Sequence, residues 1–155
     1  MRKWLLLLLC LFVPQMICLA ETMTVDADQF VLLQDKQQID FFGHVVIHRE
    51  DMTLKADKVR IWYQEDAQTG KKSLQQAEAV GKVDIVTDDS QGKSDYALFT
   101  TASNILVMKG DAHMTSKQGT VEGEHITYNT ETKDTKVVGG ESGKQVRFTF
   151  DEGVQ

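Results

Sequence analysis

From Thr22 onward, hydrophobic and polar residues alternate along most of the chain. Stretches such as VRIWY, KVDIV, HITYN and VRFTF place β-branched and aromatic residues at every second position, which is the pattern of half-buried β-strands. No stretch of ten or more residues keeps the apolar stripe of an amphipathic helix. Polar clusters separate the strands, as in QEDAQTGKK, TTASN and NTETKD. The pattern predicts an all-β domain.

Two markers recur in alternation along these strands. An acidic residue inside a repeated phrase, first seen as TVDADQFVL, recurs with spacings of 29, 38 and 29 residues at Asp28, Asp57, Asp95 and Glu124. A glycine recurs with spacings of 38, 29 and 29 residues at Gly43, Gly81, Gly110 and Gly139. One insertion of about nine residues around QEDAQTGKK explains the long interval in both series. Such a period indicates a stacked structural unit, so we predict about four repeats of about 29 residues.

Strand parity assigns the residues to two faces. With the glycine facing inward, the inward set in the glycine-marked strands is Ile39, Phe41, Val45, Ile47, Ala79, Val83, Ile85, Leu106, Met108, Ala112 and Met114. The repeated phrase adds Ala27, Phe30, Leu32, Ala56, Val59, Ile61, Ser94, Ala97, Phe99, Gly123, Ile126 and Tyr128. The opposite face carries His44, His48, Lys82, Asp84, Asp111, His113 and Thr115. We expect the first face to be buried and the second to meet water.

The position before each repeated acid is always small, and the next inward residue follows three positions later rather than two. This spacing predicts a bulge or corner in the acid-bearing strand, with the acid outside and accepting freed backbone N–H groups. Calcium binding is the alternative interpretation of the acids. It is disfavoured because one carboxylate per repeat places the oxygens along a line instead of around one ion.

Candidate catalytic and metal-binding groups are sparse. His44 and His48 are four residues apart, a spacing that separates them by about 13 Å on a strand at about 3.3 Å per residue. The chain has no G-x-S-x-G motif, and its serines lie away from any His and Asp grouping. The acidic residues offer no carboxylate pair that is set apart from the others. We therefore predict a protein that is not an enzyme and that uses no metal and no cofactor.

The first 20 residues read as a cleaved signal peptide. Arg2 and Lys3 precede the apolar residues 5–13, and Pro14 and Ala20 follow, as in a secretory leader. The apolar run is shorter than the roughly 18 to 20 residues of a membrane span, so an uncleaved anchor is the less favoured alternative. We expect residues 21–155 to form the exported domain, a length suited to one core.

Removal of the leader changes the composition. Both cysteines and the only proline lie within it, so the exported domain has neither a disulfide nor a thiol. The domain keeps 15 basic against 23 acidic residues, a net charge of −8. This charge argues against nucleic acid as a partner, and we expect none, because phosphate-dominated binding needs a basic surface. An acidic ligand would have to be held mainly by its apolar part.

The inward residues are large at some levels and very small at others. Recurrent small residues would leave an apolar trough instead of a filled core, although any β-sandwich or β-helix also has an aliphatic interior. Both interpretations remain open at this point.

With these features together, the chain resembles the OstA-like family of periplasmic lipopolysaccharide-transport proteins, and within it the soluble bridge component. The resemblance rests on the strands GHVVI, GKVDI and GDAHM and on ADQFVL, ADKVRI and GEHITY. It covers residues 22–150. It implies an antiparallel β-jellyroll, open at its ends, whose interior cradles lipid A acyl chains. The second copy, GKSDYALF, departs from the pattern at Ser94 and Ala97, which bears on the width of the groove there.

The resemblance also implies functional residues and partners. The expected lipid-binding groove comprises Phe30, Leu32, Ile39, Phe41, Val45, Ile47, Leu54, Val59, Ile61, Val83, Ile85, Phe99, Leu106, Met108, Met114, Val121, Ile126 and Tyr128. The expected edges for a partner or a second protomer comprise Thr24, Val25, Val146, Phe148 and Phe150. Expected partners are lipopolysaccharide, an inner-membrane transport complex, an outer-membrane translocon and further copies joined head to tail, all in the periplasm. The alternatives are a membrane-tethered protein of the same pathway and a β-scaffold that binds no lipid.

Overall fold

In a computed structural model, residues 22–141 and 143–150 form one antiparallel sheet. The predicted leader, residues 1–20, lies outside the described residues. The long strands are β3 (Gln38–Arg49), β4 (Met52–Glu65), β5 (Lys72–Val86), β6 (Ser90–Thr100), β7 (Ile105–Ser116) and β8 (Gly119–Asn129). The short elements are β1 (Met23–Asp26), β2 (Gln29–Leu33), η1 (Gln34–Lys36), η2 (Thr101–Ser103), β9 (Thr135–Val138) and β10 (Arg147–Thr149). The all-β, antiparallel prediction is confirmed.

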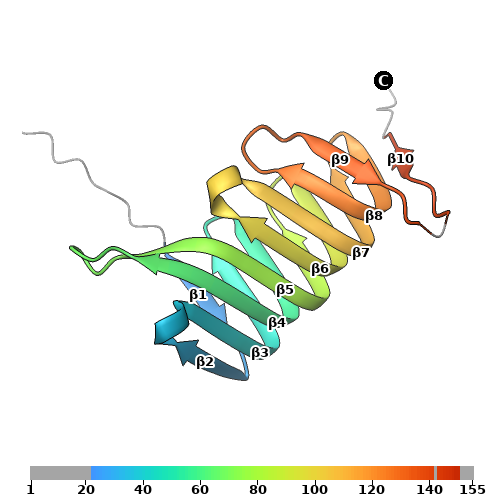
Figure 1. Cartoon of the computed structure of the whole chain (residues 1–155). Helices are drawn as coiled ribbons and strands as arrows, with labels where there is room; N and C mark the ends of the chain where they lie inside the picture. Colours follow the sequence, from blue (N-terminus) through green and yellow to red (C-terminus); the bar gives the residue numbers. More distant parts are fainter. Residues whose placement is uncertain (1–21, 142, 151–155) are drawn as a thin grey trace, which may run out of the picture.

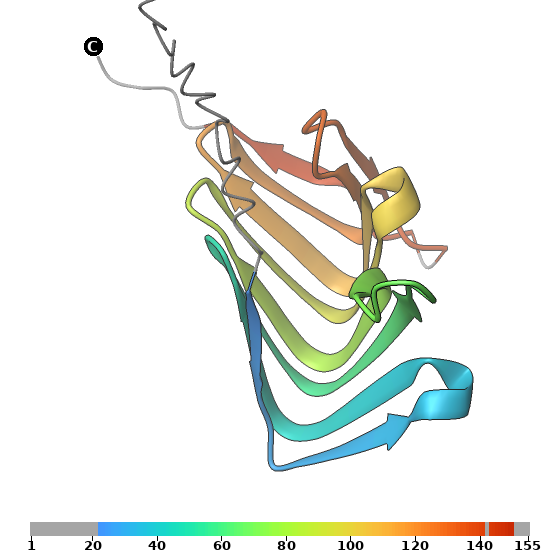
Figure 2. The ribbon, with the colours of Figure 1, turned by 90° about the vertical axis from the view of Figure 1, so that its left-hand side faces the viewer.

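The long strands stack side by side, with β1 and β2 at one end of the stack and β9 and β10 at the other (Figure 1). Each long strand bends near its middle, so the sheet is folded into a V (Figure 2). One half of β3 pairs with β1 and the other half pairs with β2. At the far end, β8 pairs with β10 and with β9 in the same way. We call the two halves of the folded sheet the β1 limb, which includes β10, and the β2 limb, which includes β9.

The bend in each glycine-marked strand is a bulge with two residues in the left-handed conformation. Gly81 and Lys82 have φ of 81° and 47°. The pairing register shifts between Lys55 and Lys58 of β4, so these two residues of β5 together face the single residue Asp57. The same pair of left-handed residues occurs at Gly43 with His44 and at Gly110 with Asp111. Glycine meets this requirement because it has no Cβ to penalise positive φ.

The repeated acids and the glycines are in contact at these corners. A Cβ on Gly81 would lie 2.5 Å from Asp57 Oδ2, and one on Gly110 would lie 2.6 Å from Asp95 Oδ2. Gly43 meets Asp28 in the same way. Asp28 also pairs with His44, whose Nδ1 lies 2.8 Å from Asp28 Oδ2. The two sequence markers are therefore the two halves of one corner.

The structure corrects two expectations about these corners. The extra residue of each bulge belongs to the glycine-marked strand and not to the acid-bearing strand. The fourth glycine, Gly139, does not contact Glu124. It follows β9, and a Cβ there would meet the backbone of Lys144. The spacing of the glycines suggested that Gly139 is equivalent to the other three. However, β9 is short, and no described strand follows it on the β2 limb.

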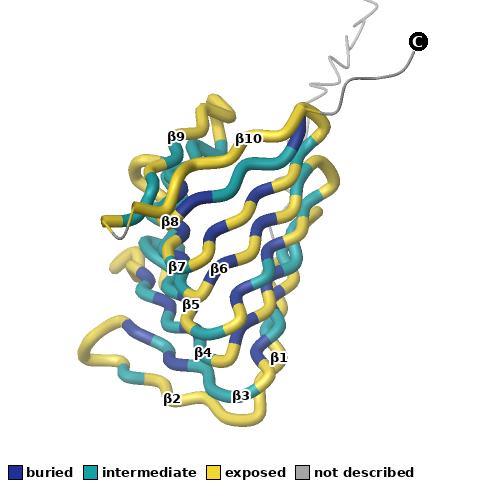
Figure 3. The backbone as a smooth tube through the Cα atoms, turned by 90° about the vertical axis from the view of Figure 1, so that its right-hand side faces the viewer, coloured by how far each residue is buried: buried dark blue, intermediate teal, exposed yellow. Residues whose placement is uncertain are grey.

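The core lies between the limbs and consists of inward residues. The assigned faces are confirmed for the buried residues of the hydrophobic core cluster, which are Val45, Ile47, Leu54, Ala56, Val59, Ile61, Ala79, Val83, Ile85, Ala97, Met108, Ala112, Met114 and Ile126. The buried stretches recur at matching levels of successive strands (Figure 3). Every residue expected on the water-facing side is exposed or half-buried. Side-chain parity in the strands is the reason for this agreement.

The first copy of the repeated phrase is an exception to the burial pattern. Ala27 is exposed, and Phe30 and Leu32 are 65% and 42% exposed. These residues lie at or beside β2, the terminal strand of the β2 limb, so none of the described strands covers them. Their position at the end of the stack leaves these residues exposed, although the sequence pattern predicted that they would be buried.

The predicted insertion is an extension of one hairpin. Strands β4 and β5 remain paired to Glu65 and Lys72, and their turn projects beyond the neighbouring turns (Figure 1). Among the described residues, no helix is long and apolar enough to cross a membrane.

The corner contact yields a test of stability. Gly81→Ala should lower the free energy of unfolding by about 2 to 4 kcal/mol, because it adds left-handed strain and a clash with Asp57. Gly70→Ala is the matched control: its φ is +67° but nothing lies within 4 Å of the added Cβ, so we expect a loss of about 1 kcal/mol. Urea unfolding measures both. Equal losses would show that the contact with the acid is unimportant.

Candidate functional site

On β6, β7 and β8, burial of the inward side chains decreases from the corners to the open side of the V, which we call the mouth. The inward residues beside the corners are almost fully enclosed: Val59 and Ile126 are 0% exposed, and Val45 and Met108 are 1% exposed. One position nearer the mouth on the β2 limb, Phe99, Leu106 and Tyr128 are only half-buried. Along these three strands the interior is therefore closed at the corners and open at the mouth, whereas Ile61 of β4, at the level of Phe99, is 3% exposed.

The two limbs pack directly against each other near the corners. Met108 belongs to the β2 limb, yet a Cβ on Gly92 of the β1 limb would lie 2.9 Å from its sulfur. Likewise, Val137 of β9 approaches Gly123 of β8, where an added Cβ would lie 2.5 Å from the valine methyl group. Glycine at these positions allows one limb to receive a large side chain from the other.

This packing favours a filled interior over a trough near the corners. The small residues Ala79, Ala97 and Ala112 are 2%, 2% and 0% exposed, so they lie in the closed part of the interior. Ser94, which with Ala97 marked the divergent second copy, is 7% exposed, and its hydroxyl donates to the carbonyl of Tyr96 at 2.9 Å. The small side chains let the limbs close and leave no open channel at the corner.

The structure divides the expected groove residues into three groups. The buried group is Val45, Ile47, Leu54, Val59, Ile61, Val83, Ile85, Met108, Met114 and Ile126. The half-buried group, nearer the mouth or the ends, is Ile39, Phe41, Phe99, Leu106, Val121 and Tyr128. Phe30 and Leu32 form the exposed group. A ligand in the V would meet the second and third groups first.

A cavity of about 730 Å³ lies between the limbs at the β10 end of the stack. Met114 and Val121 line it from the β1 limb, and Tyr128 and Val137 line it from the β2 limb. Val146 and Phe148, expected to be edge residues, close its outer end. The floor of the cavity is thus made of expected groove residues and of the C-terminal strand region.

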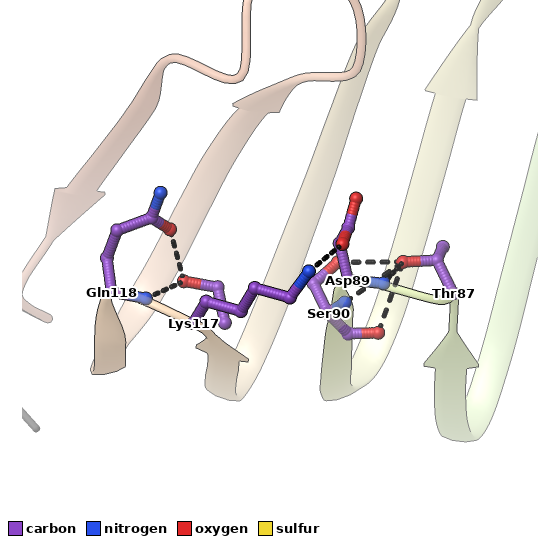
Figure 4. Close-up of polar contacts among 6 residues, drawn as sticks. Thr87, Asp89, Ser90, Lys117 and Gln118 are labelled. Atoms are coloured by element: carbon purple, nitrogen blue, oxygen red, sulfur yellow. Dashed lines mark hydrogen bonds and ion pairs between the residues drawn. The ribbon is translucent and has the colours of Figure 1, made fainter.

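The rim of this cavity carries charged residues from three turns. Lys117, in the turn between β7 and β8, donates a hydrogen bond of 2.8 Å to Asp89 in the turn between β5 and β6 (Figure 4). This hydrogen bond and the lysine charge hold the pKa of Asp89 below its usual value, and the same hydrogen bond and the Asp89 charge raise the pKa of Lys117. Lys133, in the turn between β8 and β9, lies 6.0 Å from the ring centre of Tyr128. Both lysines face the cavity.

The rim lysines were not among the expected functional residues. Both are in polar turns, where a lysine is ordinary, and turn composition does not reveal which turns share a cavity. The sequence showed only that each of these turns follows a strand with inward-facing residues.

The ends of the stack expose apolar side chains on terminal strands. β1 carries Thr24 and Val25 and has β3 as its only partner among the described strands. β10 pairs with β8 through three residue pairs. Phe148 in β10 and Phe150 just after it are 45% and 69% exposed, and their ring centres lie 4.3 Å apart in an edge-to-face arrangement. The expected edge residues therefore lie at the two ends of the sheet.

The histidines and acids do not assemble a metal site in the described part of the chain, where no three metal-ligating side chains gather. His48 contacts Thr53, with 3.1 Å between Nδ1 and Oγ1. The acids at the corners instead contact the glycines of the backbone bends described above.

The fold and the cavity define a class of protein: an open-ended β-jellyroll with an apolar interior that is reached from one side. The chain belongs to the family described as LptA/(LptD N-terminal domain) LPS transport protein, whose model matches residues 24–134. This agrees with the family expected from the sequence.

Among solved structures, the chain is similar to LptH from Pseudomonas aeruginosa, described as the LptA homologous periplasmic component of a lipopolysaccharide transport device. The TM-score is 0.72 at 16% identity, and the match covers 84% of this chain and 96% of that one. At this identity the likeness shows the fold alone. No curated protein matches the chain in sequence.

The division of the interior into a closed part and an exposed part can be tested by measuring the stability of two variants. Met108→Ala should lower the free energy of unfolding by about 2 to 5 kcal/mol, because it leaves a cavity in the closed part. Phe30→Ala removes a larger side chain that is 65% exposed and should cost less than about 1 kcal/mol. Denaturant unfolding of both variants measures the difference. Similar losses would contradict the proposed closure at the corner.

Proposed function

We propose that the protein is a periplasmic lipopolysaccharide carrier that holds lipid A acyl chains between its limbs. The observation that carries the proposal is a cavity of about 730 Å³, lined in part by apolar side chains of both limbs, in a member of a lipopolysaccharide transport family. The similarity to a periplasmic component and the secretory pattern of residues 1–20 support the location.

The physical chemistry of the interior suits acyl chains. Burial of hydrocarbon contributes roughly 0.8 kcal/mol per CH₂, so a short length of each chain is enough to hold a lipid. Residues 21–155 have a net charge of −8, which repels the lipid phosphates over most of the surface. Retention by the apolar part and repulsion of the charged part would together keep binding reversible, as transport requires.

Acyl chains would enter at the mouth. The half-buried residues there, such as Leu106 and Tyr128, are the first apolar surface that a chain meets, whereas Val59 and Ile126 are already enclosed by protein. We infer that the mouth residues contact lipid and that the corner residues hold the limbs together. Deeper entry would need the limbs to separate.

The terminal strands would join protomers head to tail and join the ends to an inner-membrane complex and an outer-membrane translocon. An edge strand offers unpaired N–H and C=O groups that a strand from another chain can pair with. The β1 and β10 regions lie at opposite ends of the stack, so pairing one with the other would extend the sheet and align the interiors of successive copies.

Photo-crosslinking tests the carrier function. A photoreactive residue at Phe99 should capture lipopolysaccharide, and the same residue at Leu98 should not, because the two neighbours point to opposite faces of β6. Leu106 and Val107 on β7 form a second matched pair. Capture would be detected as a lipopolysaccharide-positive band of reduced mobility after irradiation.

Two outcomes would contradict the proposal. Equal capture from both faces would indicate nonspecific adhesion of lipid to the sheet. Absence of capture from Phe99 and Leu106, with concentration-dependent assembly intact, would favour a scaffold that binds protein edges and no lipid.

Sedimentation velocity tests head-to-tail assembly. The purified protein should form larger species as its concentration rises, and Phe148→Asp should shift it to the monomer by placing a charge on the terminal strand. Val86→Asp is the matched control, because Val86 is 41% exposed, close to the 45% of Phe148, but lies in the middle of the stack. Assembly unaffected by Phe148→Asp, or equally weakened by Val86→Asp, would contradict the proposed edge.

A further inference from the structure

The cavity at the β10 end has two chemically different parts. Its floor is apolar, formed by Met114, Val121, Tyr128 and Val137, and its rim is polar. The charged residues that line it are Asp89, Lys117 and Lys133. An apolar floor beneath a cationic rim is complementary to an amphiphile with hydrocarbon chains and an anionic headgroup.

The two lysines lie on opposite sides of the mouth. Lys117 belongs to the β1 limb and Lys133 to the turn that ends the β2 limb, and both line the same cavity. The charge of Lys133 also acts on Asp89, the carboxylate that Lys117 binds, so both lysine charges act on the same group. A headgroup at the mouth would meet positive charge from both limbs.

Hydrogen bonds within the turns order the backbone that carries both lysines. The side-chain oxygen of Asn129 accepts hydrogen bonds of 2.9 Å from the N–H groups of Glu131 and Thr132, and the Lys133 N–H donates to the Asn129 carbonyl at 2.9 Å. Lys133 itself is left-handed, with φ of 67°. On the other limb, Ser116 hydrogen-bonds the side chain of Gln118 at 2.9 Å. Little ordering of the backbone would be needed on binding.

Asp89 is the carboxylate that pairs with Lys117, at 2.8 Å. Its turn is braced by Thr87, whose hydroxyl accepts the N–H of Ser90 at 3.1 Å (Figure 4). Both partners of the ion pair are largely exposed, with side chains 79% and 69% accessible, so the pair is weak and exchangeable. A phosphate carries more charge than a carboxylate, and one anchored beside the rim by acyl chains in the cavity would compete effectively for the same ammonium group, whereas a free phosphate ion lacks that anchor.

We propose that Lys117 and Lys133 bind a phosphate group of the amphiphile whose acyl chains lie in the cavity between the limbs, with Asp89 as the counter-ion that the phosphate displaces from Lys117. This role rests on the proposed carrier function and adds the class of headgroup and the residues that hold it. In a domain with a net charge of −8, the rim is a local site where an anionic headgroup is attracted.

The test compares two ligands that differ only in phosphate: bisphosphorylated lipid A and its phosphatase-treated counterpart. Their affinities are measured by displacement of an uncharged fluorescent acyl probe from the purified protein. We expect the wild type to prefer the phosphorylated lipid by about fivefold at physiological ionic strength, as two exposed ion pairs would give. The doubly substituted variant Lys117→Gln/Lys133→Gln should lose this preference and keep its affinity for the dephosphorylated lipid.

Two further variants sharpen the result. Asp89→Asn removes the competing carboxylate and should increase the preference by about twofold. Lys93→Gln is the matched control, because Lys93 is an exposed lysine, with a side chain 60% accessible, that pairs with Asp84 on the outer face of the sheet. It should leave both affinities unchanged.

Inorganic phosphate alone distinguishes a headgroup site from a site for the free ion. At matched ionic strength it should weaken binding of the phosphorylated lipid no more than chloride does. Saturable binding of inorganic phosphate, without any preference between the two lipids, would overturn the proposal. So would a preference that survives in the double variant, or an equal loss of affinity for both lipids. Failure of the wild type to bind either lipid would instead overturn the carrier function itself.

Discussion

The contact between a glycine and an acidic residue at each corner is the constraint on which the rest of the structure depends. Two left-handed residues, as at Gly81 and Lys82, face the single residue Asp57, and the missing Cβ leaves room for the carboxylate. Because the bends fall at matching levels of successive strands, they add up to a V instead of a flat sheet. The interior, the mouth and the two ends of the stack all follow from this alignment.

The V separates stability from binding within the same strands. Near the corners, side chains such as Met108 cross from one limb to the other and are fully enclosed. Toward the turns the limbs diverge, and residues such as Tyr128 keep part of their apolar surface accessible. A mutation can therefore affect folding or ligand contact according to its distance from the corner, even where the residue types are the same.

Particular residues show how far the sequence pattern could reach. Alternation placed Val59 and Ile126 correctly in the core, because side-chain direction along a strand is a local property. The pattern also located the corners, but it assigned the bulge to the wrong strand and treated Gly139 as equivalent to the other glycines. Alanines such as Ala97 suggested an open trough, whereas the structure places them where the limbs close. The rim lysines had no sequence signal, since turn residues carry no parity.

The amino-acid sequence by itself determined the strands, their two faces and the level at which each strand bends, because all three depend on local backbone and side-chain geometry. Tertiary structure alone decided which rows of inward residues are closed, which apolar residues remain exposed at the ends, and which turns share the mouth. These features depend on how closely the limbs approach and on which strands have neighbours. Residues distant in sequence, such as Lys117 and Lys133 with Asp89, acquire a common site only through that approach.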